Sequence, residues 1–121
     1  MKAGGIKQIA LAVKDLDAAA AFYGDVLGLP LLFKAEPQMA FFDIEGIRLM
    51  LSQAEEVKPG GPILYFSVED IDGAYGDLDQ KGANCIREPL MTHKTDASEL
   101  WLAFFTDPDG HTLALFEERA I

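Results

Sequence analysis

The chain has 121 residues, half of them hydrophobic, and a formal net charge of −10 from 20 acidic and 10 basic residues. This length is sufficient for a buried core without disulfides, and the single cysteine, Cys85, is expected to be a small buried hydrophobe. The acidic balance argues against nucleic acid and anionic membrane surfaces as partners, because both attract basic protein surface, and it is compatible with a cationic ligand. No apolar run approaches the length of a membrane span, and residues 1–5 lack the apolar segment of a signal peptide, so we expect a cytoplasmic protein.

The first half of the chain begins with a strand and a helix. Residues 6–13 alternate larger apolar side chains with small or polar ones, which predicts a strand with one packed face. Asp15 or Asp17 can cap the helix that follows, which we expect from residue 18 to about residue 27. Gly28 is suited to the left-handed residue that ends a helix.

A second strand at 31–35 then leads into a hairpin at 40–51. Residues 54–61 are rich in charged residues, Gly and Pro, and form the linker-like segment of the chain. The second half is expected to contain a strand at 63–68, a helix entry at 69–72, a helix stop at Gly82, a strand at 83–88, a polar loop at 91–98 and a final hairpin at 103–116. The turn of that hairpin, Asp107-Pro108-Asp109-Gly110, contains residue types that favour a tight turn.

The two halves repeat one pattern. Ala40-Phe41-Phe42 recurs as Ala103-Phe104-Phe105, and Gly46 recurs as Gly110. Upstream, Val13-Lys14-Asp15-Leu16-Asp17 aligns with Val68-Glu69-Asp70-Ile71-Asp72. Each half therefore predicts a βαβββ module, and together they predict an α+β fold in one domain, 1–121, made of repeats at about 6–53 and 62–118. One helix covers one face of such a sheet, so we expect two modules, within the chain or across a homodimer, to close around a ligand cleft.

Three sequence segments, in this order, resemble the glyoxalase/bleomycin-resistance/dioxygenase superfamily, whose members are also called vicinal oxygen chelate proteins. The segments are Ile9-x-Leu11-x-Val13-x-Asp15-Leu16, Phe22-Tyr23-x-x-Val26-Leu27-Gly28 and Asp107-Pro108-Asp109-Gly110. The resemblance covers essentially the whole chain and implies paired βαβββ modules, a cleft in each cupped sheet and assembly as a homodimer. These are fold-making residues, so they define a fold more than a chemistry.

Metal-dependent members of that superfamily carry four cleft-facing ligands, on the first and last strand of each module. By resemblance, those places are Gln8, Met50, Ile63 and Ala114 in this chain. An amide, a thioether and two alkyl groups do not make a site for a divalent ion, so we expect no metal and no other cofactor. The metal-dependent activities of the family, glyoxalase I, epimerase and extradiol dioxygenase, are correspondingly in doubt.

The same places suggest an apolar cleft with few polar groups, which suits an aromatic or drug-like ligand. We expect the ligand-binding side chains to be Gln8, Phe42, Met50, Ile63, Tyr65, Trp101 and Ala114. Met50 and Ile63 have an equally simple interpretation as core residues. His93, in the expected polar loop, is the candidate general base, whereas His111 is expected to be an exposed residue beside the turn.

Two functions remain open at this point. The first is a metal-free small-molecule-binding protein, similar to the bleomycin-resistance branch, in which a homodimer holds its ligand. The second is a glyoxalase-type lyase or isomerase, or a dioxygenase-like enzyme, with a displaced or degraded metal site that uses Gln8 and His93.

Overall fold

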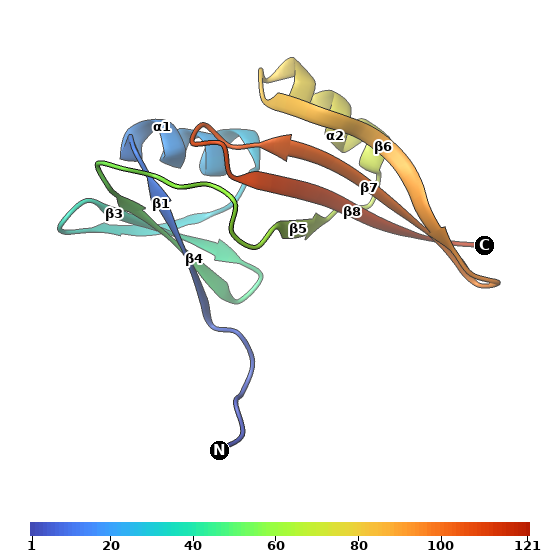
Figure 1. Cartoon of the computed structure of the whole chain (residues 1–121), viewed down its shortest axis with the longest axis horizontal. Helices are drawn as coiled ribbons and strands as arrows, with labels where there is room; N and C mark the ends of the chain where they lie inside the picture. Colours follow the sequence, from blue (N-terminus) through green and yellow to red (C-terminus); the bar gives the residue numbers. More distant parts are fainter. The chain divides into compact units, whose positions relative to one another are not determined.

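The computed structural model describes all 121 residues and divides them into two compact units, Met1–Lys58 and Pro59–Ile121 (Figure 1). Each unit has the element order strand, helix, strand, strand, strand, so the predicted α+β fold with two βαβββ modules is confirmed. The first unit consists of β1 (Gln8–Val13), α1 (Leu16–Ala21), the π-helical turn η1 (Phe22–Val26), β2 (Leu31–Ala35), β3 (Met39–Ile44) and β4 (Ile47–Gln53). The second consists of β5 (Leu64–Ser67), α2 (Ile71–Gln80), β6 (Asn84–Lys94), β7 (Ser98–Thr106) and β8 (Thr112–Ala120).

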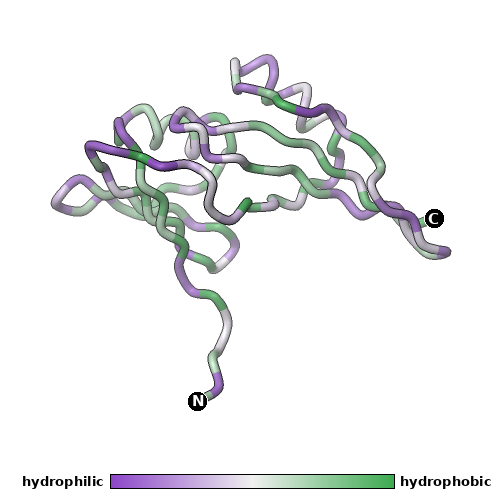
Figure 2. The backbone as a smooth tube through the Cα atoms, in the orientation of Figure 1, coloured by the Kyte–Doolittle hydropathy of each residue, from purple (hydrophilic) through white to green (hydrophobic).

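Both sheets have the same topology. The strand order is β1-β4-β3-β2 in the first unit and β5-β8-β7-β6 in the second. The first strand of each unit runs parallel to the last, and the other neighbours are antiparallel. In the second unit, the central parts of β7 and β8 consist mainly of hydrophobic residues, as Figure 2 shows. Neither helix is long and apolar enough to cross a membrane.

Each helix is held at its start by two side chains. Asp15 accepts a hydrogen bond from the Ala18 N–H at 3.1 Å, and Asp70 accepts one from the Gly73 N–H at 3.2 Å. The last strand of each sheet supplies a second acceptor for the helix: Gln53 Oε1 for the Leu16 N–H (3.0 Å) and Glu117 Oε1 for the Ile71 N–H (2.8 Å). These bonds satisfy backbone donors that have no partner inside the helix.

The first helix differs from its expected range of 18–27. It begins at Leu16, and regular α-helix ends at Ala21, where η1 continues it. The π-helical turn buries both Phe22 and Tyr23, whose rings meet edge to face at 5.3 Å. The single apolar stripe of a regular α-helix does not place two consecutive residues in the core, whereas the π-helical turn buries both of these aromatic side chains.

The helix of each unit packs on one face of its own sheet, and the core lies between them. Fully or nearly buried side chains of this layer are Val13, Tyr23, Phe42, Leu49 and Leu51 in the first unit, and Ile71, Leu78, Ala103, Phe105 and Leu113 in the second. We call the other face of each sheet, which its helix does not cover, the open face.

The two expected hairpins are present. In the β3–β4 turn, Glu45 and Gly46 have φ of 46° and 97°, and Asp43 Oδ1 accepts the Gly46 N–H at 3.0 Å. In the β7–β8 turn, Asp107 Oδ1 accepts the N–H groups of Asp109 and His111, both at 2.9 Å. An aspartate at the first turn position makes such bonds to the backbone ahead of it.

The expected polar loop at 91–98 is mostly strand, because β6 extends to Lys94. The turn that follows is narrow: Thr95 Oγ1 accepts the Ser98 N–H at 3.0 Å and the Ala97 N–H at 3.2 Å. Three register shifts interrupt the pairing of β6 with β7. His93 therefore lies on a strand rather than on a loop.

Candidate functional site

The open face of the first unit follows from the alternation along β1 and β4. Gln8, Ala10 and Ala12 are exposed on β1, whereas Leu49 and Leu51 of β4 are fully buried on the helix side. The parallel register places Gln8 beside Arg48 and Ala10 beside Met50. Small side chains on β1 therefore leave the larger groups of β4 accessible on this face.

An arginine and two phenylalanines form the centre of this face. The rings of Phe33 (β2) and Phe41 (β3) stack with centroids 4.5 Å apart and an interplanar angle of 23°. The Arg48 guanidinium carbon lies 5.5 Å from the Phe33 centroid and 5.6 Å from the Phe41 centroid, within the range of cation–π contacts. We call Phe33, Phe41 and Arg48 the Arg48 cluster.

Gln8 and Met50, both expected in the site, are brought together beside this cluster. The Gln8 Nε2 group donates to Met50 Sδ at 3.9 Å, and Met50 pairs with Phe41 across the β3–β4 ladder. The face thus combines apolar surface with one amide and one guanidinium, a composition suited to a small organic ligand.

The second unit repeats this arrangement with other residues. Tyr65 is 50% exposed on β5, and its ring meets the Phe104 ring edge to face with centroids 6.2 Å apart. Arg87 lies over the Phe104 ring at 6.0 Å from its centroid. Ala114, the register partner of both Tyr65 and Phe104, is on this face but fully covered, and Ile63, just before β5, is 38% exposed.

Two expected binding residues face the helices instead. Phe42 is 1% exposed, and its ring lies 6.5 Å from the Tyr23 ring in the core, so Phe41 takes its expected place on the open face. Trp101 has the strand parity of the buried Ala103 and Phe105, not that of Phe104. Successive residues of a strand point to opposite faces, and this alternation corrects both placements.

Trp101 belongs to a polar network next to the start of α2. Its Nε1 group donates to Glu99 Oε1 at 3.1 Å, and the Arg119 guanidinium lies 4.3 Å from its ring centroid. Arg119 donates to Glu117 at 2.7 Å and to Asp72 of α2 at 3.1 Å. The hydrogen bond from Arg119, aided by that from the Ile71 N–H, lowers the pKa of Glu117. This network attaches α2 to β8, so its evident role is structural.

His93 is exposed on β6 and pairs with Leu100 near the β6–β7 turn. Its imidazole has no hydrogen-bond partner. A general base needs a group that orients it or a substrate within reach. The structure brings no such partner group to His93.

The thiol of Cys85 is half-buried beside Tyr75 of α2. Burial raises the pKa of Cys85 and also that of Tyr75. A thiol with a raised pKa is a poor nucleophile, which agrees with the expected packing role.

The four places of the family's metal ligands do not fit a metal ion. Gln8 and Met50 lie in the first unit and provide an amide and a thioether, whereas Ile63 and Ala114 lie in the second and provide no donor. Elsewhere, no group of three or more His, Cys, Asp or Glu side chains is arranged to hold a metal ion. We therefore derive no chemical step through a metal.

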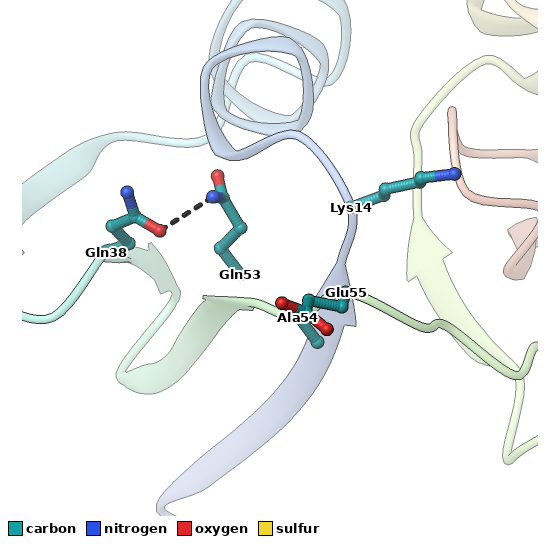
Figure 3. Close-up of a pocket in the computed structure, with 5 residues that line it drawn as sticks. All are labelled: Lys14, Gln38, Gln53, Ala54 and Glu55. Atoms are coloured by element: carbon teal, nitrogen blue, oxygen red, sulfur yellow. Dashed lines mark hydrogen bonds between the residues drawn. The ribbon is translucent and has the colours of Figure 1, made fainter.

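Two shallow hollows lie in the first unit, at the edge where β1 ends and α1 begins. The larger, about 420 Å³, is lined by Lys14, Gln38, Gln53, Ala54 and Glu55 (Figure 3). Gln53 donates to Gln38 at 2.6 Å, and Lys14 extends away from this pair. The smaller, about 260 Å³, is lined by residues of α1 and of the β2–β3 hairpin. Gln53 is already used to anchor α1, and neither hollow contains aromatic surface, so we regard the open faces as the better candidate site.

Sequence reasoning missed the residues that dominate the open faces: Phe33, Phe41, Arg48, Arg87 and Phe104. Along β4, the apolar Leu49 and Leu51 alternate with Arg48 and Met50, so Arg48 could have been placed on the open face from this pattern in the sequence. Arg87 could not, because a register shift separates it from Cys85.

Comparison with known proteins defines the family. The Glyoxalase/Bleomycin resistance protein/Dioxygenase superfamily model matches residues 5–115. The uncharacterized protein YraH of Bacillus subtilis is 30% identical, with 91% of this chain and 95% of that protein covered. The metallothiol transferase FosB of Lysinibacillus sphaericus is 30% identical, with 92% of this chain and 80% of that protein covered.

Among solved structures, lactoylglutathione lyase from Agrobacterium tumefaciens has a TM-score of 0.74 at 22% identity, covering 97% of this chain and 96% of that one. At this identity the likeness shows the fold alone, and it agrees with the two βαβββ units described above. From the family match over residues 5–115, the chain belongs to the glyoxalase/bleomycin resistance protein/dioxygenase superfamily.

Proposed function

We propose that this protein is a metal-free small-molecule-binding member of its superfamily, with the ligand on the open face of a unit. The observation that carries the proposal is the pair of open faces, each built from aromatic and aliphatic side chains with an arginine over a phenylalanine ring. Apolar surface with a few convergent polar groups is typical of sites for drug-sized molecules. We also propose that the working form is a homodimer in the cytoplasm.

The residues at the family's metal places support the metal-free part of the proposal. Gln8 alone offers an oxygen ligand among them, and its amide nitrogen faces the sulfur of Met50. A catalytic zinc site usually has three protein ligands, and hard divalent ions need several oxygen ligands. The purified protein should therefore contain no stoichiometric Zn, Ni, Co, Mn or Fe.

Elemental analysis after desalting tests this expectation, and about one metal ion per chain would contradict it. Thermal-shift measurements with a panel of neutral, anionic and cationic aromatic compounds test the binding itself, because a ligand of the native state raises the melting temperature. The matched variants are Phe33→Ala on the open face and Leu29→Ala outside the strands. The shift should be lost in the first variant and retained in the second.

The sequence similarity to metallothiol transferases favours an enzyme as the second candidate. Such an enzyme would need a metal site away from the family's usual places, and His93 would be its first candidate residue. Turnover of a thiol and an electrophile that depends on added metal and is abolished by His93→Ala would favour this second function.

A further inference from the structure

Arg48 has a position that the fold does not explain. Its side chain is exposed on the open face of the first unit and forms no ion pair with any residue of the chain. Arg119, by contrast, is held by both Glu117 and Asp72. The donors of the Arg48 guanidinium are therefore free to bind a ligand.

The carboxylate closest to Arg48 in the ladder forms no ion pair with it. Asp43 is the register partner of Arg48 across the β3–β4 pair, but its Oδ1 accepts the Gly46 N–H of the turn at 3.0 Å. The Arg48 guanidinium instead makes cation–π contacts with the rings of Phe33 and Phe41. Arg48 donates no guanidinium N–H group to another side chain, so two parallel hydrogen bonds to a carboxylate remain open to it.

These observations point to the class of ligand. We infer, on the basis of the proposed function, that the Arg48 cluster binds a small aromatic acid in its carboxylate form. The carboxylate accepts two hydrogen bonds from Arg48, and the aromatic ring lies on Phe33 and Met50. The Gln8 amide stands at the edge of the same surface, two strands from Phe41 in the β1-β4-β3 order.

The net charge of −10 is compatible with a cationic ligand. The free guanidinium of Arg48 instead favours an anionic ligand at this site. Exposed charges more than about 8 Å apart are largely screened at physiological ionic strength. Asp43, the register partner of Arg48, forms no ion pair with it. A direct two-point contact between the guanidinium and a ligand carboxylate is stronger than the screened attraction of more distant charges, so we expect the site to select an anion.

Three probes of one shape test this inference: 2-naphthoate (anionic), 2-naphthamide (neutral) and 2-naphthylmethylammonium (cationic). Their affinities are measured by NMR titration of the ¹⁵N-labelled full chain, which also locates the site from the amides that shift. We expect 2-naphthoate to bind about fivefold to tenfold more tightly than 2-naphthamide, with shifts at Phe33, Arg48 and Met50. The difference should decrease as salt is raised.

Arg48→Met should reduce the affinity for 2-naphthoate to that for 2-naphthamide. The control, Lys34→Met, removes an exposed positive charge on β2 that forms no ion pair, and it should leave the affinity unchanged. Arg87→Met removes the arginine over Phe104 and tests whether the probe binds to the second unit instead. Arg48→Lys keeps the charge without the planar fork and should bind with intermediate affinity. Thermal unfolding of each variant shows whether it is folded.

Equal affinity for the three probes, a preference for the cation, or loss of binding in Arg87→Met rather than Arg48→Met would overturn the inference and leave the proposed binding function standing. Absence of binding by all three probes, together with no response in the thermal-shift panel, would overturn both.

Discussion

Glu117 accepts hydrogen bonds from the Arg119 side chain at 2.7 Å and from the Ile71 backbone N–H at 2.8 Å, at the start of α2. The Arg119 hydrogen bond is the larger of the two influences that lower the pKa of Glu117. A carboxyl whose pKa is lower in the folded chain than in the unfolded chain stabilises the fold above the unfolded value, about 4.3. That stabilisation is lost as the pH falls through the lower, folded pKa.

We therefore predict that Glu117→Gln lowers the free energy of unfolding at pH 7 and that the difference from the wild type shrinks below about pH 4.3. The neighbouring Glu118→Gln is the control, because Glu118 is exposed and has no side-chain partner. Urea unfolding at a series of pH values measures both differences. A difference for Glu117→Gln that stays constant down to pH 3 would contradict the assignment.

Adjacent residues of the same type also show what the sequence could and could not reveal. Phe41 and Phe42 are equally hydrophobic and both are buried, at 7% and 1% exposed, and only the register of β3 decides which one points toward the helix. The repeat Ala-Phe-Phe predicted the hairpin correctly without specifying its faces. The family resemblance placed Met50 in the cleft and Tyr65 beside it, whereas the placement of Phe42 and Trp101 required the register.

Helix α2 contains two glycines, Gly73 and Gly76, that differ in their surroundings. A Cβ added at Gly73 would lie 2.6 Å from Oδ2 of Asp70, the residue that caps the helix. A Cβ added at Gly76 would meet no atom within 4 Å. Both positions are exposed, so packing does not otherwise distinguish them.

We predict that Gly76→Ala stabilises the protein by about 1 kcal/mol, because alanine has the higher helix propensity. Gly73→Ala gains the same propensity but displaces the Asp70 cap, which costs about 1 kcal/mol, so its net effect should be close to zero. Urea unfolding of the two variants compares them directly. Equal stabilisation by both substitutions would show that the Asp70 cap contributes little.

At the scale of elements, the sequence predicted most strands and both helices because their apolar periodicity and caps are strong. It did not predict the π-helical turn η1 or the extension of β6 to Lys94. Residues 91–94 are exposed and, apart from Met91, polar, and β6 is an edge strand with three register shifts. A polar edge strand lacks the alternation from which strands are recognised, since neither of its faces is fully buried.

At the scale of the whole molecule, the internal repeat extends beyond the elements to the way each helix is anchored. Gln53 and Glu117 occupy corresponding positions in β4 and β8 and accept the first N–H of corresponding helices. This shared contact was not evident from the sequence, because a glutamine at the end of β4 and a glutamate within β8 do not indicate their partners. The repeat nevertheless makes the two open faces comparable, each with an arginine over the equivalent phenylalanine, Phe41 or Phe104.

The open faces and their rims also lead to a prediction about assembly. Leu31, Leu32 and Phe33 are 50%, 48% and 43% exposed in the first unit, and Tyr65, Ile86 and Leu90 are 50%, 56% and 52% exposed in the second. Each unit therefore exposes several large apolar side chains, and monomeric proteins seldom leave large apolar patches uncovered, so we predict a homodimer in which a second copy covers part of this surface. Light scattering after gel filtration should give twice the chain mass of 13.2 kDa.

Leu32→Lys should weaken the dimer, whereas Asp96→Lys places the same side chain in the exposed β6–β7 turn and should leave it intact. A monomer mass for the unmodified chain at micromolar concentration would refute the prediction, and equal weakening by both variants would attribute the effect to charge rather than to apolar contact.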